Sequence, residues 1–474
     1  MPPTQADKRV VPNGVTNSDL VASLFPLPLT PLEKFLLQCE TPRSSMVIRV
    51  VMRLSGQCQP DLYVETLRRA LSRHPLLNCR LQEVGREMFW VPGTPEPIPV
   101  VQTAGSIFLP EIGSQEISID LKTSVGLRTA IAIMDDGVKV VLDAHHALTD
   151  GNGLRQIITD WFHLYHCAVT GTPEKLPEMN HERLLHRHLF PQPPAIAPIS
   201  LKDAIRNFLV TVRGRTSRWA LPKFKKRTSE EETRSHCVEE LLTIEQCEQL
   251  HFRLDAWKVK LNDLVMVSCM STFARLAPSG SMGHRITVMN PTDLRLPSDR
   301  TLSATNRFGI AVLRRRRSEC LKPEKILRGI HDEMNYVRSN YVGVEFIKGL
   351  ASASKFRGGI ALFRRLGWLM PSFQWTCLGD IARGVKRLVP MKDGLPITGS
   401  LRLETATGFS PFADEVPISV ATCEANRRIT LTVRSSPFFL TLDETQKFAA
   451  ALVQQMCTMP LPSKQAGSVS SGDD

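Results

Sequence analysis

The pattern of hydrophobic and polar residues predicts three strands in the first third of the chain. Residues 46–54 (M-V-I-R-V-V-M-R-L) are rich in β-branched residues and end at Ser55-Gly56, a pair that favours a turn. Residues 127–134 and 138–144 are two further apolar runs, and the Asp-Asp-Gly sequence between them predicts a hairpin. The second strand of this hairpin leads directly into two adjacent histidines.

Apolar residues three and four positions apart predict helices around these strands. Thr30-Pro31 has the residue types that begin a helix, because threonine caps the first turn and proline suits the first helical position. Residues 61–73 form an amphipathic pattern that His74-Pro75 ends. Residues 154–165 form another, and Gly171 stops it. The two histidines therefore lie between a predicted strand and a predicted helix.

The second half of the chain also alternates strands and helices. We predict strands at residues 237–242, 285–289, 309–313, 418–422 and 429–433, a turn at Asn290-Pro291-Thr292-Asp293, and helices at 243–257, 264–276 and 441–456. Strands and helices interleave in both halves, which predicts an α/β fold with α+β layering.

The chain has 474 residues, which is long for one hydrophobic core and suits two. A stretch rich in proline and then in basic residues separates the two alternating patterns and indicates a connector. We expect a flexible leader at 1–25, an N-terminal lobe with the two histidines at 26–175, a connector at 176–234, a C-terminal lobe at 235–460 and a disordered tail at 461–474.

Composition narrows the class of protein. No segment approaches the ~20 consecutive apolar residues of a membrane span, and no apolar run follows the first charges as in a secretory signal. The eleven cysteines are scattered singly, without C-x-x-C pairs, and indicate reduced thiols of an intracellular protein. We expect a cytoplasmic protein that holds no metal.

The net charge is +12, so the protein attracts anions. Nine basic residues and one acid lie within 201–229, and Arg314–Arg317 adds four consecutive arginines. No zinc spacing, aromatic RNA-binding strand or helix-turn-helix pattern accompanies this charge, so we expect no nucleic acid partner. The basic residues could lie on solvated faces, or they could bind a partner protein, an acidic lipid surface or a phosphorylated cofactor, and the sequence leaves these four interpretations open.

The string H-H-A-L-T-D-G, residues 145–151, is the strongest chemical signal. It ends a predicted strand and opens a predicted helix, where rigid elements can aim side chains into a cleft. The spacing H-x-x-x-D alone is weak, because His251 and Asp255 repeat it inside a polar-faced helix. We interpret that second copy as a surface contact.

Three interpretations of the paired histidines are open at this point. A neutral imidazole can take a proton from a hydroxyl or amine and pass it to a leaving thiolate. Two hydrogen-bonded histidines at a strand end are the structural alternative. Metal binding is a third, although adjacent strand residues point to opposite faces and no third ligand is evident. The absence of G-x-S-x-G and of a nearby cysteine favours direct transfer without a covalent enzyme intermediate.

On these residues the chain resembles the chloramphenicol-acetyltransferase-like acyltransferases, a superfamily that includes condensation domains, polyketide-associated acyltransferases, alcohol acetyltransferases and wax ester synthases. L-T-P-L-E-K-F-L-L and A-L-S-R-H-P-L-L-N-C-R-L resemble the family's opening, and L-N-D-L-V-M resembles the Asn-Asp motif of wax ester synthases. N-P-T-D-L-R followed by N-R-F-G is similar to the second-domain strand and latch. The resemblance covers most of the chain in order.

The resemblance implies two similar lobes around a central tunnel, with His146 as the general base midway along it. It implies that His145, Asp150 and Gly151 support this base and that Asp150 pairs with an arginine, for which Arg295 is the candidate. Asn306 and Gly309 would line or shape the centre. Asn262 and Asp263 are either a helix cap or part of the site.

Some residues depart from the family pattern. Gly153 occupies a position where many members have a small hydroxyl residue, so no oxyanion contact is expected from it. Residues 376–379 (T-C-L-G) resemble the S-N-x-G region without its asparagine. The D-F-G-W-G string of plant acyltransferases is absent, and the length leaves room for the two lobes alone, so we expect a freestanding protein.

We therefore predict an acyltransferase that moves an acyl group from a coenzyme A or carrier-protein thioester to a hydroxyl or amine, with no permanently bound cofactor. A non-catalytic protein that binds a carrier protein or a lipid is the alternative, and an acylated Cys377 is a second enzyme mechanism. Residues 206–219 and 356–370 mix bulky apolar with basic residues. They predict either a covered interdomain helix or peripheral membrane contact that delivers a lipid acceptor.

Overall fold

The computed structural model describes residues 23–41, 44–95, 97–102, 118–191, 235–277, 284–365, 371–392, 394–413 and 416–462. Nearly all of the expected leader and tail, and residues 192–234 of the expected connector, lie outside the described residues. The basic segment 201–229 and the apolar-basic stretch 206–219 belong to that part.

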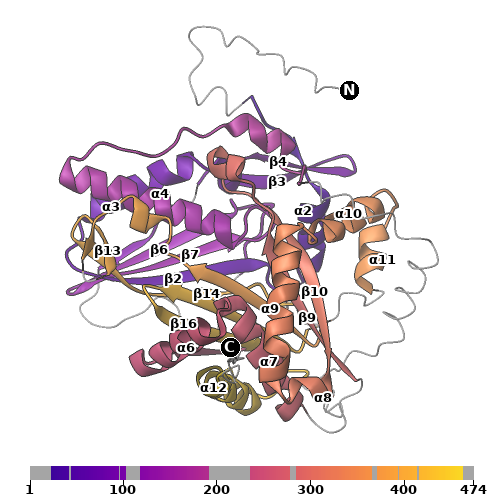
Figure 1. The fold of residues 1–474 in the computed structure, drawn as a ribbon. Helices are drawn as coiled ribbons and strands as arrows, with labels where there is room; N and C mark the ends of the chain where they lie inside the picture. Colours follow the sequence, from indigo (N-terminus) through magenta and orange to yellow (C-terminus); the bar gives the residue numbers. More distant parts are fainter. Residues whose placement is uncertain are drawn as a thin grey trace, which may run out of the picture.

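A seven-stranded sheet in the order β12-β13-β14-β2-β7-β6-β5 forms the first lobe. Helices α3 (Pro60–Ser72) and α4 (Gly151–Thr170) cover one of its faces (Figure 1). Tyr63 of α3 and Trp161 of α4 are fully buried between them, with ring centroids 4.4 Å apart. The strands of this seven-stranded sheet are β2 (Val47–Ser55), β5 (Val100–Gln102), β6 (Leu127–Met134), β7 (Gly137–His145), β12 (Met391–Lys392), β13 (Leu395–Thr398) and β14 (Leu401–Phe409).

A six-stranded sheet in the order β10-β9-β11-β15-β16-β8 forms the second lobe. Its strands are β8 (His236–Leu241), β9 (Arg285–Asp293), β10 (Phe308–Arg316), β11 (Phe373–Asp380), β15 (Ile418–Ala425) and β16 (Arg428–Ser435). Helices α7 and α12 pack on this sheet, and α6 and α9 pack against them. With the short α8 (Arg317–Cys320), the helices of this lobe are α6 (Ile244–Trp257), α7 (Leu261–Leu276), α9 (Pro323–Ser339) and α12 (Leu442–Thr458).

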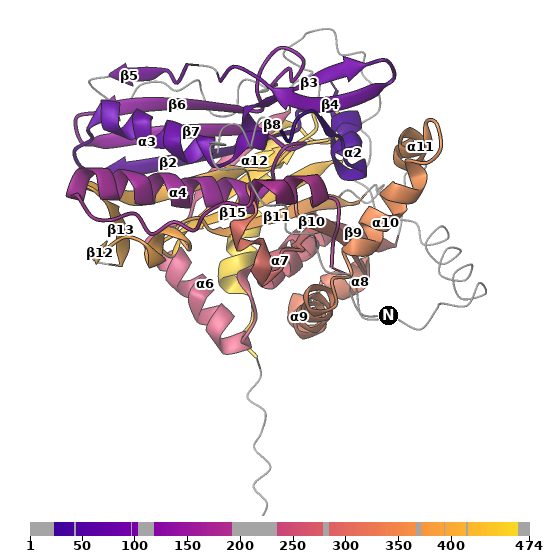
Figure 2. The same ribbon diagram turned by 90° about the horizontal axis from the view of Figure 1, so that it is seen from above.

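A small third sheet in the order β1-β4-β3 lies beside helix α2 (Pro31–Cys39) in the first lobe. Its strands are β1 (Leu27–Pro28), β3 (Cys79–Val84) and β4 (Glu87–Pro92). Two further helices, α10 (Val344–Ala353) and α11 (Gly359–Arg365), belong to the second half of the chain but contact α2 (Figure 2).

The two lobes share strands. Residues 391–409, which we predict to belong to the C-terminal lobe, enter the first lobe's sheet as β12, β13 and β14, and β14 pairs with β2. The next strands return to the second sheet, where Thr430 and Thr432 donate side-chain hydrogen bonds of 2.8 Å to carbonyls of β14. The chain therefore crosses between the sheets, and this crossing holds the lobes together.

Local sequence signals explain most element boundaries. Thr30 caps α2 and accepts a hydrogen bond from the Glu33 amide at 3.2 Å, as its residue type predicts. Gly171 ends α4 with a left-handed φ of 70°, a conformation that glycine adopts without strain. The predicted strands at 46–54, 127–134 and 138–144 are confirmed by β2, β6 and β7.

One predicted turn is wrong. Residues 290–293 continue strand β9 to Asp293, and Pro291 pairs with Ile310 of β10. Beyond Met289 strand β11 no longer pairs with β9, so that side of β9 has no strand neighbour among the described residues. Proline is tolerated on such an unpaired side because no ladder hydrogen bond is lost there.

Two of the four consecutive arginines of β10 and α8 bond residues of other helices. Arg315 pairs with Glu333 at 2.7 Å, and Arg317 donates to the carbonyls of Ala274 and Ala277 at the end of α7. Cations are favourable at a helix C-terminus, where the carbonyls lack partners within the helix. Among the described helices, none is long and apolar enough to cross a membrane.

Candidate active site

The two histidines of the motif lie where β7 passes into the turn before α4. His145 is the last residue of β7 and pairs with Val47 of β2. The His146 amide donates to the carbonyl of Met46, the residue just before β2, at 2.6 Å, which fixes the first turn residue beside the start of that strand. The strand therefore determines where both imidazole rings lie.

His146 has one ring nitrogen engaged. Its Nδ1 lies 2.9 Å from the Thr149 carbonyl, and only a protonated nitrogen can donate to that oxygen. In the neutral ring Nε2 therefore carries the lone pair. The ring stacks on Phe308 with centroids 5.0 Å apart. Burial lowers the pKa of His146 below its ordinary value, so the ring is neutral at physiological pH.

His145 has both ring nitrogens engaged. Its Nδ1 accepts a hydrogen bond from the Ala147 amide at 3.1 Å, so Nε2 carries the proton and donates to Glu40 at 2.9 Å. The side chain is fully buried. Glu40 follows the last residue of α2, so His145 joins this helix to the turn. The two histidines have different environments, and His146 is the one that borders the cavity described below.

Asp150 begins helix α4 and accepts four hydrogen bonds. The Gly153 amide donates to it at 2.9 Å, the Arg307 amide at 2.8 Å, and Arg295 donates two bonds at 2.8 and 2.9 Å. Burial alone would raise the pKa of Asp150, but the Arg295 guanidinium and these hydrogen bonds lower it below its ordinary value. The ion pair with Arg295 that the resemblance implies is present in the structure.

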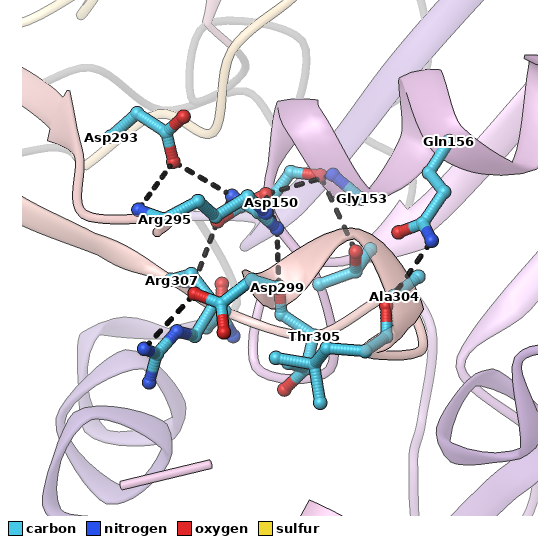
Figure 3. Close-up of polar contacts among 12 residues, drawn as sticks. Asp150, Gly153, Gln156, Asp293, Arg295, Asp299, Ala304, Thr305 and Arg307 are labelled. Atoms are coloured by element: carbon cyan, nitrogen blue, oxygen red, sulfur yellow. Dashed lines mark hydrogen bonds and ion pairs between the residues drawn. The ribbon is translucent and has the colours of Figure 1, made fainter. Parts of the chain in front are cut away.

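Arg295 extends this contact into a network between the two halves of the chain (Figure 3). It also donates to Asp293 at 3.1 Å and to the Thr305 carbonyl at 2.9 Å. Six residues further along the chain from Asp150, Gln156 of α4 donates to the Leu302 carbonyl at 3.1 Å. The segment from 293 to 307 is thus fastened to the beginning of α4.

Asn306 holds the histidine turn from the opposite side. Its Nδ2 donates to the carbonyls of His146 and Ala147 at 2.7 and 3.0 Å. Gly309 follows in β10, where a Cβ would lie 2.2 Å from the Gly343 carbonyl oxygen, so only glycine fits. At Gly151 a Cβ would lie 2.4 Å from Cδ2 of Leu378, the end of a flexible side chain, so this position is less strictly constrained than Gly309. These residues shape the turn and the strand beside it.

Asn262 and Asp263 belong to a different cluster. Lys260 is the N-cap of α7, so neither residue is the helix cap. Asp263 is fully buried and bonds His331 at 2.6 Å and Arg338 at 3.2 Å. Asn262 accepts a hydrogen bond from Trp375 at 3.0 Å. This network fastens α7 to α9 and β11 and does not border the cavity beside His146.

A cavity of about 230 Å³ opens between the two lobes beside His146. Its wall is mainly apolar and comes from both halves of the chain. The apolar lining residues include Phe35, Leu36, Cys39, Met46, Ile48, Met289, Phe308, Ile310, Leu378, Phe409 and Pro411; the polar ones include Asp150, Asn152, Thr292, Asp293, Gln374, Thr376 and Ser410. Cys377 also lines it, and burial raises the pKa of this thiol.

The second H-x-x-x-D string has an ordinary structural environment. His251 Nδ1 lies 2.7 Å from the Cys247 carbonyl one turn earlier in α6, and Nε2 lies 3.7 Å from Glu424. Both nitrogens face groups other than Asp255, so the predicted partner is wrong. The described residues contain no group of histidine, cysteine, aspartate or glutamate side chains that could hold a metal ion.

Comparison with known proteins identifies the fold. Neither the protein-family models nor the curated protein sequences include a match to this chain. Solved structures do match it along nearly its whole length. The epimerization domain from the third module of tyrocidine synthetase B matches with a TM-score of 0.62 and 15% identity, over 92% of this chain and 96% of that domain. The chain has the fold of the condensation domains.

Two further structures support this fold. The starter condensation domain of rhizomide synthetase, solved with C8-CoA and Leu-SNAC, matches with a TM-score of 0.61 and 15% identity over 94% of this chain and 96% of that one. Polyketide synthase associated protein 5 from Mycobacterium tuberculosis matches with a TM-score of 0.56 and 15% identity, over 91% and 97%. The predicted fold class, two α/β lobes, is confirmed. At this identity the likeness concerns the fold.

Within this condensation-domain fold, sequence reasoning missed two residues of the site. Glu40 bonds His145 across 105 positions of sequence, and no local pattern marks it. Phe308 stacks on His146, whereas the sequence indicates only the N-R-F-G string as a whole and not this ring. That string supplies Asn306, the Arg307 amide and Phe308, three contacts to the histidine turn or its aspartate.

Proposed function

We propose that the protein is an acyltransferase that moves an acyl group from a thioester to a hydroxyl or amine, with His146 as its general base. The observation that carries the proposal is the environment of His146. The ring is neutral, Nδ1 is held by the Thr149 carbonyl, and the side chain borders an apolar cavity between the lobes. A general base needs this combination of a free lone pair and access to substrate.

The reaction follows from the tautomer. Nε2 of His146 takes the proton of the acceptor O–H or N–H as the acceptor oxygen or nitrogen forms a bond to the thioester carbonyl carbon. The resulting imidazolium remains hydrogen-bonded to Thr149 through Nδ1. The carbon–sulfur bond then breaks, and His146 returns the proton to the leaving thiolate. The products are an ester or amide and a free thiol, and no bond to the enzyme forms.

Asp150 supports this step without contacting the reacting atoms in our account. Its oxygens are occupied by Arg295 and by the amides of Gly153 and Arg307. The Gly153 amide is therefore engaged and, without a side chain, this position offers no donor to an oxyanion. Asp150 and Arg295 fix the beginning of α4 and with it the turn that carries His146.

The cavity supports an apolar acyl or acceptor group next to His146. Its wall is formed largely by aliphatic, aromatic and sulfur-containing side chains. Apolar surface of this kind favours the transfer of hydrocarbon from water. We propose coenzyme A or a carrier protein as the thiol of the donor. One matching structure, the rhizomide starter condensation domain, was solved with C8-CoA and Leu-SNAC, which supports this choice.

A covalent route through Cys377 has less support. Cys377 lines the cavity, but burial raises its pKa, so the thiol rather than the nucleophilic thiolate is present at neutral pH. Direct transfer predicts no acyl adduct when the protein meets acyl-CoA without acceptor. Intact-mass measurement checks this. An adduct that the Cys377→Ser variant lacks would establish the covalent route instead.

The experiment that tests the proposed function is product analysis with acyl-CoAs of graded chain length and a panel of alcohols and amines. The proposal predicts release of free CoA together with an ester or amide whose mass is the sum of acyl group and acceptor. Loss of both in the His146→Ala variant would assign the activity to this site. If no pair of substrates gives product with either a CoA or a carrier-protein donor, the alternative of a non-catalytic binding protein is favoured.

A further inference from the structure

The turn between α10 and α11 projects from one edge of the molecule (Figure 2). Residues 354–358 of this turn are all exposed. Gly358 has a φ of 73°, and a Cβ at Gly359 would lie 2.1 Å from the Ala353 carbonyl oxygen. Both glycines are therefore needed for a tight reversal, and the shape of this tip is fixed by the sequence.

Two large apolar side chains are exposed at this tip. Phe356 is 72% exposed, the largest fraction for a large apolar residue in the described chain, and Leu362 is 57% exposed. A Cβ at Gly359 would lie 3.4 Å from the Phe356 Cβ, and Leu362 follows Gly359 by one helical turn. Residues one turn apart share a helix face. Phe356 and Leu362 are both exposed on this tip, whereas Ile360, which lies between them in sequence, is buried.

The charge around these side chains has one sign. Lys355 and Arg357 flank Phe356, and both are exposed. The sequence contains no acidic residue between Glu345 and Asp380. Lys348 is the basic residue of α10 and pairs with Glu345 at 2.8 Å, so the cations of the tip itself are not neutralised by neighbours in sequence.

We propose that this tip docks the protein on a membrane surface that contains anionic lipids. Phe356 and Leu362 enter the acyl-chain region, and Lys355 and Arg357 contact headgroup phosphates. A convex tip favours lipid over a folded partner, because a bilayer surrounds an inserted side chain from all sides and a protein would have to offer a matching hollow. Apolar residues flanked by cations are typical of segments that bind membrane interfaces.

The docked position has a consequence for the cavity. Helices α10 and α11 contact α2, and Phe346 of α10 packs edge-on against Phe35 of α2 with ring centroids 5.5 Å apart. Phe35 also lines the cavity beside His146. One helix therefore separates the docking tip from the cavity, so docking brings the cavity close to lipid. The docking itself does not depend on the proposed acyl transfer.

Cosedimentation with vesicles tests the proposal. The full chain is mixed with vesicles of phosphatidylcholine alone and of phosphatidylcholine with phosphatidylserine. We expect binding to the anionic vesicles and at least about tenfold weaker binding for the Phe356→Ala/Leu362→Ala variant, because each exposed apolar side chain that inserts contributes to affinity. Lys355→Gln/Arg357→Gln should lose the preference for phosphatidylserine.

The matched control is Phe252→Ala, which removes a phenylalanine that is 59% exposed on α6. It should bind like the parent chain, and equal melting temperatures of all variants establish that the tip substitutions leave the fold intact. The His146→Ala variant should also bind vesicles fully, which separates docking from catalysis. The proposal would be overturned if the parent chain did not bind vesicles. It would also be overturned if the Phe356→Ala/Leu362→Ala variant bound vesicles as tightly as the parent chain. Capture of a holo acyl carrier protein, rather than vesicles, by the tip would likewise overturn it.

Discussion

At the scale of single residues, the chemistry of the site depends on which nitrogen of each histidine is engaged. Nδ1 of His146 donates a hydrogen bond to the Thr149 carbonyl, whereas Nδ1 of His145 accepts a hydrogen bond from the Ala147 amide. Adjacent histidines of one motif therefore have opposite tautomers. The sequence predicts two histidines at a strand end, but the backbone groups that decide their tautomers depend on the turn.

The lowered pKa of His146 predicts a pH dependence. The free base is the active form, and burial shifts its pKa below the ordinary 6.5, so kcat/KM should rise with pH through a limb that lies below 6.5. Above this limb the rate should be level at neutral pH. Steady-state kinetics with a neutral alcohol acceptor measures the limb. An apparent pKa clearly above 6.5 would contradict a base desolvated in this way.

Asn306 should be needed for the geometry of the turn. Replacement by Ala removes donors to the carbonyls of His146 and Ala147, and we expect the free energy of unfolding to fall by about 1–3 kcal/mol. Urea denaturation measures this change. Asn340→Ala is the control, since Asn340 donates one exposed bond to Tyr336, and it should change stability by less than about 0.5 kcal/mol. Equal losses in the two variants would contradict the role of Asn306.

At the scale of elements, the ion pair between Asp150 and Arg295 fastens helix α4 to the segment after β9. Removal of Arg295 leaves a buried carboxylate without its cation, so Arg295→Ala should cost about 3–5 kcal/mol of unfolding free energy. Arg315→Ala breaks a more exposed pair with Glu333 and should cost about 0–1 kcal/mol. Denaturation of both variants compares them. A loss in Arg295→Ala no larger than in Arg315→Ala would show that the pair does not fasten these elements.

Element boundaries were predictable where a single residue type decides them. Thr30 acts through its own side chain and Gly171 through its own φ angle, so the local sequence is sufficient at these two boundaries. The predicted turn at 290–293 is wrong, because the effect of Pro291 depends on whether its strand is paired on both sides. A proline is excluded from a strand that is paired on both sides, but it is tolerated where the neighbouring strand has ended. Strand pairing depends on residues far away in the chain, so the local sequence does not decide between these cases.

At the scale of the whole molecule, the sequence predicts two α/β lobes but not the crossing of strands between them. Residues 391–409 follow β11 of the second sheet and then join the first sheet, and their local pattern is that of any strand. The cavity could not be predicted either, because its wall combines α2 with strands of both sheets. His146, Asp150 and Gly151 are the residues of that wall that belong to the H-H-A-L-T-D-G string.

The buried histidines predict how stability changes with pH. Burial lowers the pKa of His163, His166 and His181 below 6.5, so the unfolded chain binds protons more readily than the folded one. Their contribution to stability is fully present above pH 6.5 and is lost as the pH falls through the lower folded values. The melting temperature should therefore decrease from pH 8 to pH 5. A melting temperature that rises on acidification would contradict these assignments.

The central claim is that His146 is the base of an acyl transfer, and the most direct measurement is the single-turnover rate of His146→Ala. We predict a rate about 10²–10⁴ lower than that of the parent chain with the fold unchanged, as is typical when a general base is removed. His251→Ala, which alters the second H-x-x-x-D string on α6, should retain the parent rate. A folded His146→Ala variant that transfers acyl groups at the parent rate would contradict the account.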